Sequence, residues 1–123
     1  MHQSEKSEGR VYVREPWASL LVSGAKRVET AHIQLPDRFA LRWLDVQNEA
    51  AEVVGRVLFD GWIRWFDANT FDREHHRHLV PSGSPFHFNK RKRTFGWRVA
   101  EFERFERPQP TKRMASQFRL ELY

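Results

Sequence analysis

The chain has 123 residues, 40% of them hydrophobic and 14% aromatic, and it carries a formal net charge of +5. This length predicts one domain with one modest core, and the aromatic content argues against a disordered chain. Because the sequence contains no cysteine, a disulfide framework and a thiolate metal site are both excluded.

The excess of positive charge lies in the C-terminal part of the chain. Residues 1–72 carry 9 Lys and Arg against 11 Asp and Glu, whereas residues 73–123 carry 12 against 5. Clustered positive charge favours a polyanionic partner, since each neutralised phosphate releases counterions; a merely solubilising surface is the alternative. The sequence shows neither a signal-peptide pattern nor a long apolar run, so we expect a cytoplasmic protein without a membrane partner.

The first residues differ in character from the rest of the chain. Residues 1–10 are polar and have no periodicity, so we expect a disordered leader, with the folded domain spanning residues 11–123. Residues 11–14 alternate and are rich in β-prone side chains, which predicts that the domain opens with a strand.

A short helix is predicted over residues 16–23. Trp17, Leu20 and Leu21 recur at helical spacing, and Gly24 can adopt the left-handed conformation that ends a helix. A helix of two turns is not stable alone, so its apolar face is expected to pack on a sheet.

The remainder of the domain is predicted to be mainly β. A second short helix is expected between residues 66 and 80, a long loop over 81–93 and a turn at 108–110. About six strands with two short helices predict an α+β, mainly β fold, a small barrel with helices that plug it. Runs rich in β-branched and aromatic residues predict strands at residues 26–33, 39–46, 53–63 (broken by Gly55 and Gly61), 94–99 with an extension to 105, and 118–122.

Two separated segments resemble the ASCH domain family. Residues 15–30 read EPWASLLVSGAKRVET, which resembles the family's opening signature, (Q/E)PWA followed by a helix and GxKxxE. Later, SPF at residues 84–86, FGWRV at 95–99 and Pro108 resemble its closing half. The similarity covers about residues 11–123 and implies a PUA-like β-barrel with a cleft beside the GxKxxE turn.

The resemblance implies two classes of function. Relatives have been linked to RNA binding and coactivator-type nucleic-acid recognition, and also to ribonuclease activity and hydrolysis of acylated cytidines. The first reading is therefore a module that binds single-stranded or modified RNA or a nucleotide-like ligand, and the alternative is a hydrolase acting on RNA or acylated pyrimidine nucleosides. A protein-interaction or purely structural domain is a third, weaker reading.

This sequence departs from the family signature at two positions. Ala31 stands where members usually have an arginine, and Glu29 stands where the acylcytidine hydrolases have a threonine. Thr30 is adjacent, but in a strand it would point to the opposite face. These differences favour binding over amidohydrolase chemistry.

The GxKxxE motif supplies the central candidates. Lys26 follows the helix-ending Gly24 by two residues, so its ammonium could reach a phosphate or carbonyl in the cleft. Glu29 could pair with Lys26 or accept hydrogen bonds from a base or sugar. In the hydrolase reading the two are catalytic: Lys26 stabilises developing negative charge and Glu29 acts as general acid or base.

Further ligand contacts are expected from aromatic, loop and basic residues. An aromatic ring beside a basic site can stack on a base, although such rings more often pack in a core. A basic run follows a backbone without reading its sequence, and a solvated hairpin tip is the alternative. These ligand- or RNA-binding candidates are Pro16, Trp17, Ser84, Phe86, Phe95, Trp97 and the basic run of Lys90, Arg91, Lys92 and Arg93.

A histidine-rich segment at residues 74–78 does not carry a metal-binding pattern. Only His75 and His78 share a helical face, and no HExxH spacing is present. We therefore expect neither a metal nor a cofactor; the oligomeric state is not predicted.

Overall fold

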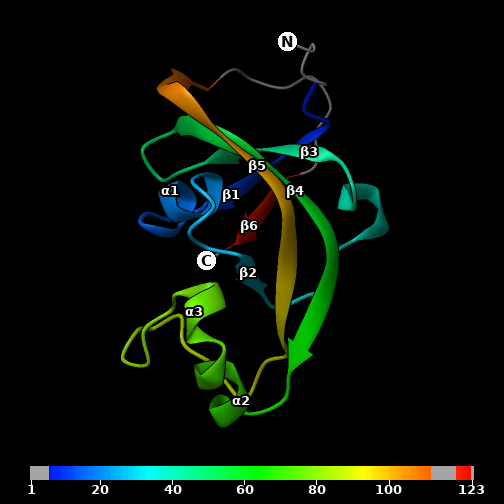
Figure 1. The fold of residues 1–123 in the computed structure, drawn as a ribbon, viewed down its shortest axis with the longest axis vertical. Coiled ribbons are helices and arrows are strands. Elements are labelled where there is room, and N and C mark those ends of the chain that lie inside the picture. The colour runs from blue at the N-terminus through cyan, green and yellow to red at the C-terminus, as the bar shows by residue number, and fades with distance from the viewer. Residues whose placement is uncertain (1–5, 112–118, 123) are drawn as a thin grey trace.

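One curled sheet forms the body of the protein. The computed structural model describes residues 6–111 and 119–122, and its six strands lie in the order β2-β5-β4-β3-β1-β6 (Figure 1). The predicted mainly-β fold with short helices is confirmed. The strands are β1 (Gly9–Val13), β2 (Val28–Ala31), β3 (Trp43–Gln47), β4 (Glu52–Trp65), β5 (Thr94–Pro110) and β6 (Arg119–Leu122), and the helices are α1 (Trp17–Val22), the 3-10 helix η1 (Asp37–Phe39), α2 (Ala68–Arg73) and α3 (His75–His78).

The two long strands β4 and β5 run antiparallel through the body of the molecule, and α2 and α3 lie beyond one end of them (Figure 1). Their pairing shifts register near Gly55 and Gly61, so the predicted breaks are bulges within one continuous strand. The predicted turn at residues 108–110 is wrong, because β5 continues through Pro110, which pairs with Glu52.

The third strand begins later than expected. The predicted strand over residues 39–46 is replaced by η1 and then by β3, which starts at Trp43. Leu41 between them has a φ of 58°, a left-handed conformation that interrupts extended chain. Phe39 remains in the core, at 1% exposure.

The first helix packs as its pattern predicts. Trp17, Ala18, Leu21 and Val22 are buried, and α1 lies against β4 and β5. Gly24 follows with a φ of 87°, so the glycine takes up the left-handed turn after the helix.

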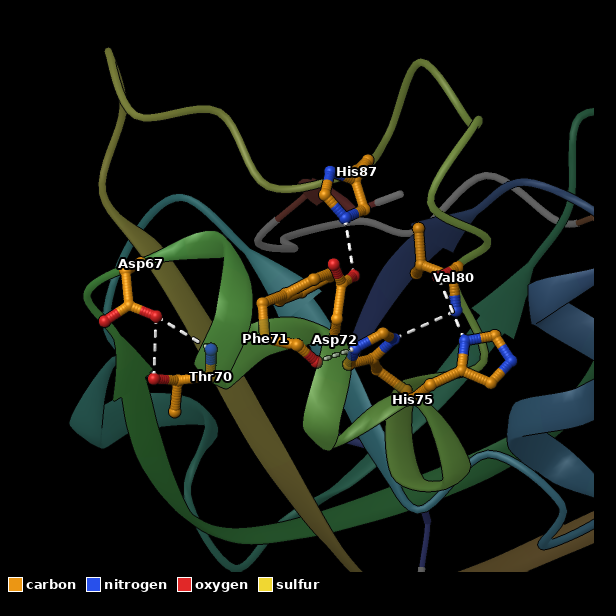
Figure 2. Close-up of polar contacts among 8 residues, drawn as sticks. Asp67, Thr70, Phe71, Asp72, His75, Val80 and His87 are labelled. Carbon is orange, nitrogen blue, oxygen red and sulfur yellow. Dashed lines mark hydrogen bonds and ion pairs between the residues drawn. The ribbon is translucent and has the colours of Figure 1, made fainter.

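Two short helices stand where one was predicted, at the far end of β4 (Figure 1). Asp67 caps α2 by accepting a hydrogen bond of 2.7 Å from the backbone nitrogen of Thr70 (Figure 2). The chain breaks at Glu74, forms α3, and leaves it through Leu79 at a φ of 62°.

These helices cover an aromatic cluster on the sheet. The Trp65 ring meets Phe71 edge to face at 4.9 Å and His78 at 5.5 Å between centroids. A Cβ on Gly96 would lie 2.6 Å from Cη2 of Trp65, so the glycine makes room for this ring. The cluster therefore fixes α2 and α3 to β4 and β5.

The ends of the described chain lie in one part of the sheet. β1 begins at Gly9, two residues before the predicted domain boundary, and pairs in parallel with both β3 and β6. β6 matches the predicted last strand, whose first residue, Phe118, lies outside the described residues. The edge strands β2 and β6 also approach each other, which shows how far the sheet curls. No helix in the described part of the chain is long and apolar enough to cross a membrane.

Candidate functional site

Lys26, in the connection after α1, and Glu29, in β2, form a buried ion pair. The backbone nitrogen of Lys26 donates to Leu20 at 3.0 Å, which folds the chain back after α1 and directs Lys26 inward. Its Nζ lies 3.3 Å from Oε1 of Glu29, and both side chains have 0% exposure. The expected proximity is present, but the pair lies inside the protein and not on the wall of an open cleft.

Burial dominates the electrostatics of this pair. Removal from water raises the pKa of Glu29 to about 7, against the opposing attraction of Lys26, and burial also lowers the pKa of Lys26. Oε1 of Glu29 also accepts from the backbone nitrogen of Thr30 at 3.1 Å, whereas Oε2 has no hydrogen-bond partner among the described residues. A carboxylate therefore lies in the interior with a pKa close to neutral pH and one oxygen unsatisfied.

His78 connects this pair to the helices α2 and α3. Nζ of Lys26 donates to the backbone carbonyl of His78, at the end of α3. The imidazole Nε2 donates to the Phe71 carbonyl at 2.7 Å, and Nδ1 accepts from the backbone nitrogen of Val80 at 2.9 Å. Because the backbone N–H of Val80 can only donate, Nδ1 carries no hydrogen, and the imidazole is neutral with its hydrogen on Nε2. Burial lowers the pKa of His78 to about 4.

Trp17 and Phe86, both predicted site residues, meet although they are far apart in the sequence. Their rings pack edge to face at 5.1 Å, and Nε1 of Trp17 lies 3.4 Å from the carbonyl oxygen of Leu79. Trp17 is 7% exposed, so its ring packs against protein and does not present a face to a base. Pro16 beside it is exposed.

Phe95 and Trp97, which were expected to stack on a ligand, belong to the core. Trp97 is 0% exposed, donates from Nε1 to the Ile33 carbonyl at 3.0 Å, and packs edge to face on Phe59 at 5.4 Å. Phe95 is 2% exposed. Antiparallel pairing places Trp97 opposite the buried Glu29 and Phe95 opposite the buried Ala31 of β2, and burial leaves neither ring free to stack on a ligand.

The basic run lies on the surface between two pockets. All four side chains, of Lys90, Arg91, Lys92 and Arg93, are exposed in the loop before β5. Ser84, in the same loop, accepts a hydrogen bond at Oγ from the backbone nitrogen of Phe86 at 3.0 Å. One pocket, of about 720 Å³, is lined by residues that include Phe66, Ser84, Phe88, Asn89 and Lys90, and the other, of about 510 Å³, by residues that include His32, Leu35, Asp37, Arg93 and Phe95.

His75 of α3 and His87 of the loop that follows it both contact other groups of the protein. Nδ1 of His75 lies 3.2 Å from the Val80 carbonyl, and Nε2 of His87 lies 2.7 Å from Asp72 (Figure 2). In the described part of the chain, no group of three or more His, Cys, Asp or Glu side chains could hold a metal ion.

Sequence reasoning missed two features of this region. From the sequence, His78 was considered only as a residue of the predicted second helix and as a metal ligand; its carbonyl contact with Lys26 lies where the chain leaves α3 through the left-handed Leu79, which no motif marks. Phe66, 73% exposed, had been placed without a role. Residues 62–66 read WIRWF and show no apolar–polar alternation, so no sequence signal indicates that Phe66 is exposed.

Comparison with known proteins identifies the fold. No family model matches the chain, and no curated protein matches it. The structure of an ASCH protein from Zymomonas mobilis matches with a TM-score of 0.67 and 18% identity, over 84% of this chain and 73% of the other. A serine-to-alanine mutant of the Zymomonas mobilis protein matches with a TM-score of 0.64 and 18% identity, over 85% of this chain and 77% of the other. A tyrosine-to-phenylalanine mutant matches with a TM-score of 0.66 and 17% identity, over 84% of this chain and 76% of the other. The protein therefore shares the fold of these ASCH structures.

Proposed function

We propose that this protein binds single-stranded or modified RNA, or a nucleotide-like ligand, on the surface around the basic run. The observation that carries the proposal is the position of this run: Lys90 lines one pocket and Arg93 lines the other. Among the described residues, no carboxylate forms an ion pair with any of the four cations. Four unneutralised charges in succession favour a phosphate backbone.

The pockets favour a single strand over a duplex. The first pocket has two aromatic side chains in its wall, the exposed Phe66 and the half-buried Phe88, whereas Phe95 in the wall of the second is buried. Unpaired bases can enter such pockets, whereas the bases of a duplex are stacked inside the helix and the protein meets mainly sugar and phosphate.

In this proposal the Lys26–Glu29 pair positions the binding surface. Lys26 holds the carbonyl of His78, and Val80, two residues later, leads into the loop that carries the basic run. Because both members of the pair are fully buried, contact with a ligand would require α3 to move away.

A hydrolase is the second candidate, and one observation favours it. Glu29 has a pKa of about 7, an unsatisfied oxygen and a neighbouring ammonium, which is the arrangement of a general acid or base beside a group that stabilises negative charge. The complete burial of the pair weighs against it, because a substrate needs access to the reacting oxygen. Binding is therefore the preferred function.

Direct binding and turnover assays separate the two candidates. The purified protein is incubated with labelled single-stranded RNA, with an RNA duplex of the same length and with N4-acetylcytidine, and both retention and products are measured. We expect retention of the single strand, weaker retention of the duplex and no product. Failure to retain any RNA would contradict the proposal, and product formation would favour the hydrolase.

A further inference from the structure

The end of β4 presents a row of large side chains to solvent. From residue 62 onward the exposure of the side chains alternates: Trp62, Arg64 and Phe66 are exposed, whereas Ile63 is half-buried and Trp65 is buried. Trp62 is 41% exposed and Phe66, directly after the strand, is 73% exposed. Two exposed aromatic rings thus flank one exposed arginine on the same face.

The arginine is ordered by aromatic rings. The Arg64 guanidinium lies 4.4 Å from the centroid of Phe66 and 5.7 Å from that of Phe95, and Trp62 meets Phe95 edge to face at 5.4 Å. No carboxylate within the described residues forms an ion pair with Arg64. The row therefore consists of Trp62, Arg64 and Phe66, which contact one another or the shared neighbour Phe95, and no carboxylate neutralises the charge of Arg64.

This row adjoins the basic run at both pockets. Phe66 lines the pocket that contains Lys90, and Phe95, on which Trp62 and Arg64 pack, lines the pocket that contains Arg93. Flat π-faces beside a line of cations match the two parts of a single-stranded nucleic acid, its bases and its phosphates. Rings and arginines also occur in protein interfaces, but lysines are depleted there, and five unneutralised cations match a phosphate chain better than a protein partner.

We propose that Trp62, Arg64 and Phe66 form a platform on which the bases of single-stranded RNA stack, while its phosphates meet the basic run. The proposal rests on the proposed function and assigns the bases and the phosphates to different side chains. Removing the rings should therefore weaken recognition of bases and leave the electrostatic contribution unchanged.

The test compares the wild type with Trp62→Ala, Phe66→Ala and the double variant. Phe102→Ala is the matched control, because Phe102 is a 47% exposed ring of β5 that pairs opposite Val57, five residues before Trp62 in β4. Affinities are measured by fluorescence anisotropy for a single-stranded RNA of mixed sequence and for a chain of the same length with abasic sites, each over a range of salt concentrations. Urea unfolding of each variant verifies that it is folded.

We expect the double variant to bind RNA about 10- to 100-fold more weakly, as for the loss of stacking on one base or more. Its affinity for the abasic chain and its salt dependence should match the wild type, and Phe102→Ala should remain within about twofold of the wild type. Wild-type affinity of the double variant for RNA would overturn the platform.

Two further outcomes separate the platform from the proposed function. If alanine substitution of the basic run weakens RNA binding but loss of both rings does not, RNA binding stands and the platform is wrong. If the wild type binds no RNA, the proposed function and the platform are both wrong. If the wild type sediments as a dimer that the double variant abolishes, the rings form a contact between copies of the chain and the platform is overturned.

Discussion

The ammonium of Lys26 caps helix α3 by donating to the backbone carbonyl of His78. The carbonyls of the last helical turn have no partner within the helix, and a cation at this end is favoured by the helix dipole. Lys26 is therefore satisfied from two sides, by the carbonyl of His78 and by the carboxylate of Glu29. This arrangement joins the GxKxxE segment to the two helices that precede the basic loop.

The buried pair should behave as one unit in stability measurements. Lys26→Met should lower the free energy of unfolding by about 3–5 kcal/mol, because it leaves the buried Glu29 and the His78 carbonyl without their common partner. The double change Lys26→Met with Glu29→Gln should cost less than the sum of the two single changes. Urea unfolding of the four proteins measures this, and additive losses would contradict direct coupling.

His78 should contribute to stability through its backbone contacts. His78→Leu leaves the buried nitrogen of Val80 without an acceptor, which should cost about 1–3 kcal/mol. The neighbouring exposed His76 provides the control, since His76→Ala should change the free energy of unfolding by no more than about 0.5 kcal/mol. Equal effects of the two substitutions would show that the contacts of His78 do not stabilise the fold.

The pH dependence of stability should show two opposing contributions. The pKa of Glu29 rises from 4.5 to about 7 on folding, so between these values the folded state holds more protons and stability falls as pH rises. The pKa of His78 falls from 6.5 to about 4, so between about 4 and 6.5 the unfolded state holds more protons and stability rises with pH. The two contributions partly cancel in the wild type.

Glu29→Gln removes one of these contributions. Its free energy of unfolding should therefore increase more steeply with pH between about 4.5 and 6.5 than that of the wild type. Urea midpoints at three pH values in this range provide the measurement. Parallel pH profiles would show that Glu29 does not hold its proton in the folded state.

The same substitution distinguishes binding from catalysis. Because Glu29 is buried, Glu29→Gln should change RNA affinity by less than about tenfold, and neither protein should turn over RNA or N4-acetylcytidine. If the wild type does show turnover, and Glu29→Gln lowers it by about 10² to 10⁴ while binding survives, Glu29 is a proton-transfer group. Product assays at fixed enzyme concentration decide between these results.

Local patterns predicted most of the fold. The apolar face of α1, the helix-ending Gly24 and the runs that form β1, β2 and β4 all depend on neighbours in the sequence, and these elements were predicted close to their observed bounds. The continuation of β5 to Pro110 was not, because pairing with β4 outweighs the turn preference of residues 108–110.

The candidate site was less predictable because burial is a tertiary property. The spacing of Lys26 and Glu29 indicated that they are neighbours, but not that α3 covers them. The exposure of an aromatic ring could not be predicted from the sequence either. Trp97 and Trp62 pair opposite each other in the sheet, yet Trp97 is 0% exposed and Trp62 is 41% exposed. The packing of elements distant in the sequence decides between these two states.

The salt dependence of RNA binding tests the central claim most directly. Each phosphate contact to a single strand contributes a slope of about −0.7 in log affinity against log salt, so replacing Lys90, Arg91, Lys92 and Arg93 with Ala should reduce the slope by up to about 3 units. A variant with Arg104→Ala and Arg107→Ala, two exposed arginines further along β5, should reduce it by less for each charge removed. An unchanged slope in the four-alanine variant would contradict RNA binding by the basic run.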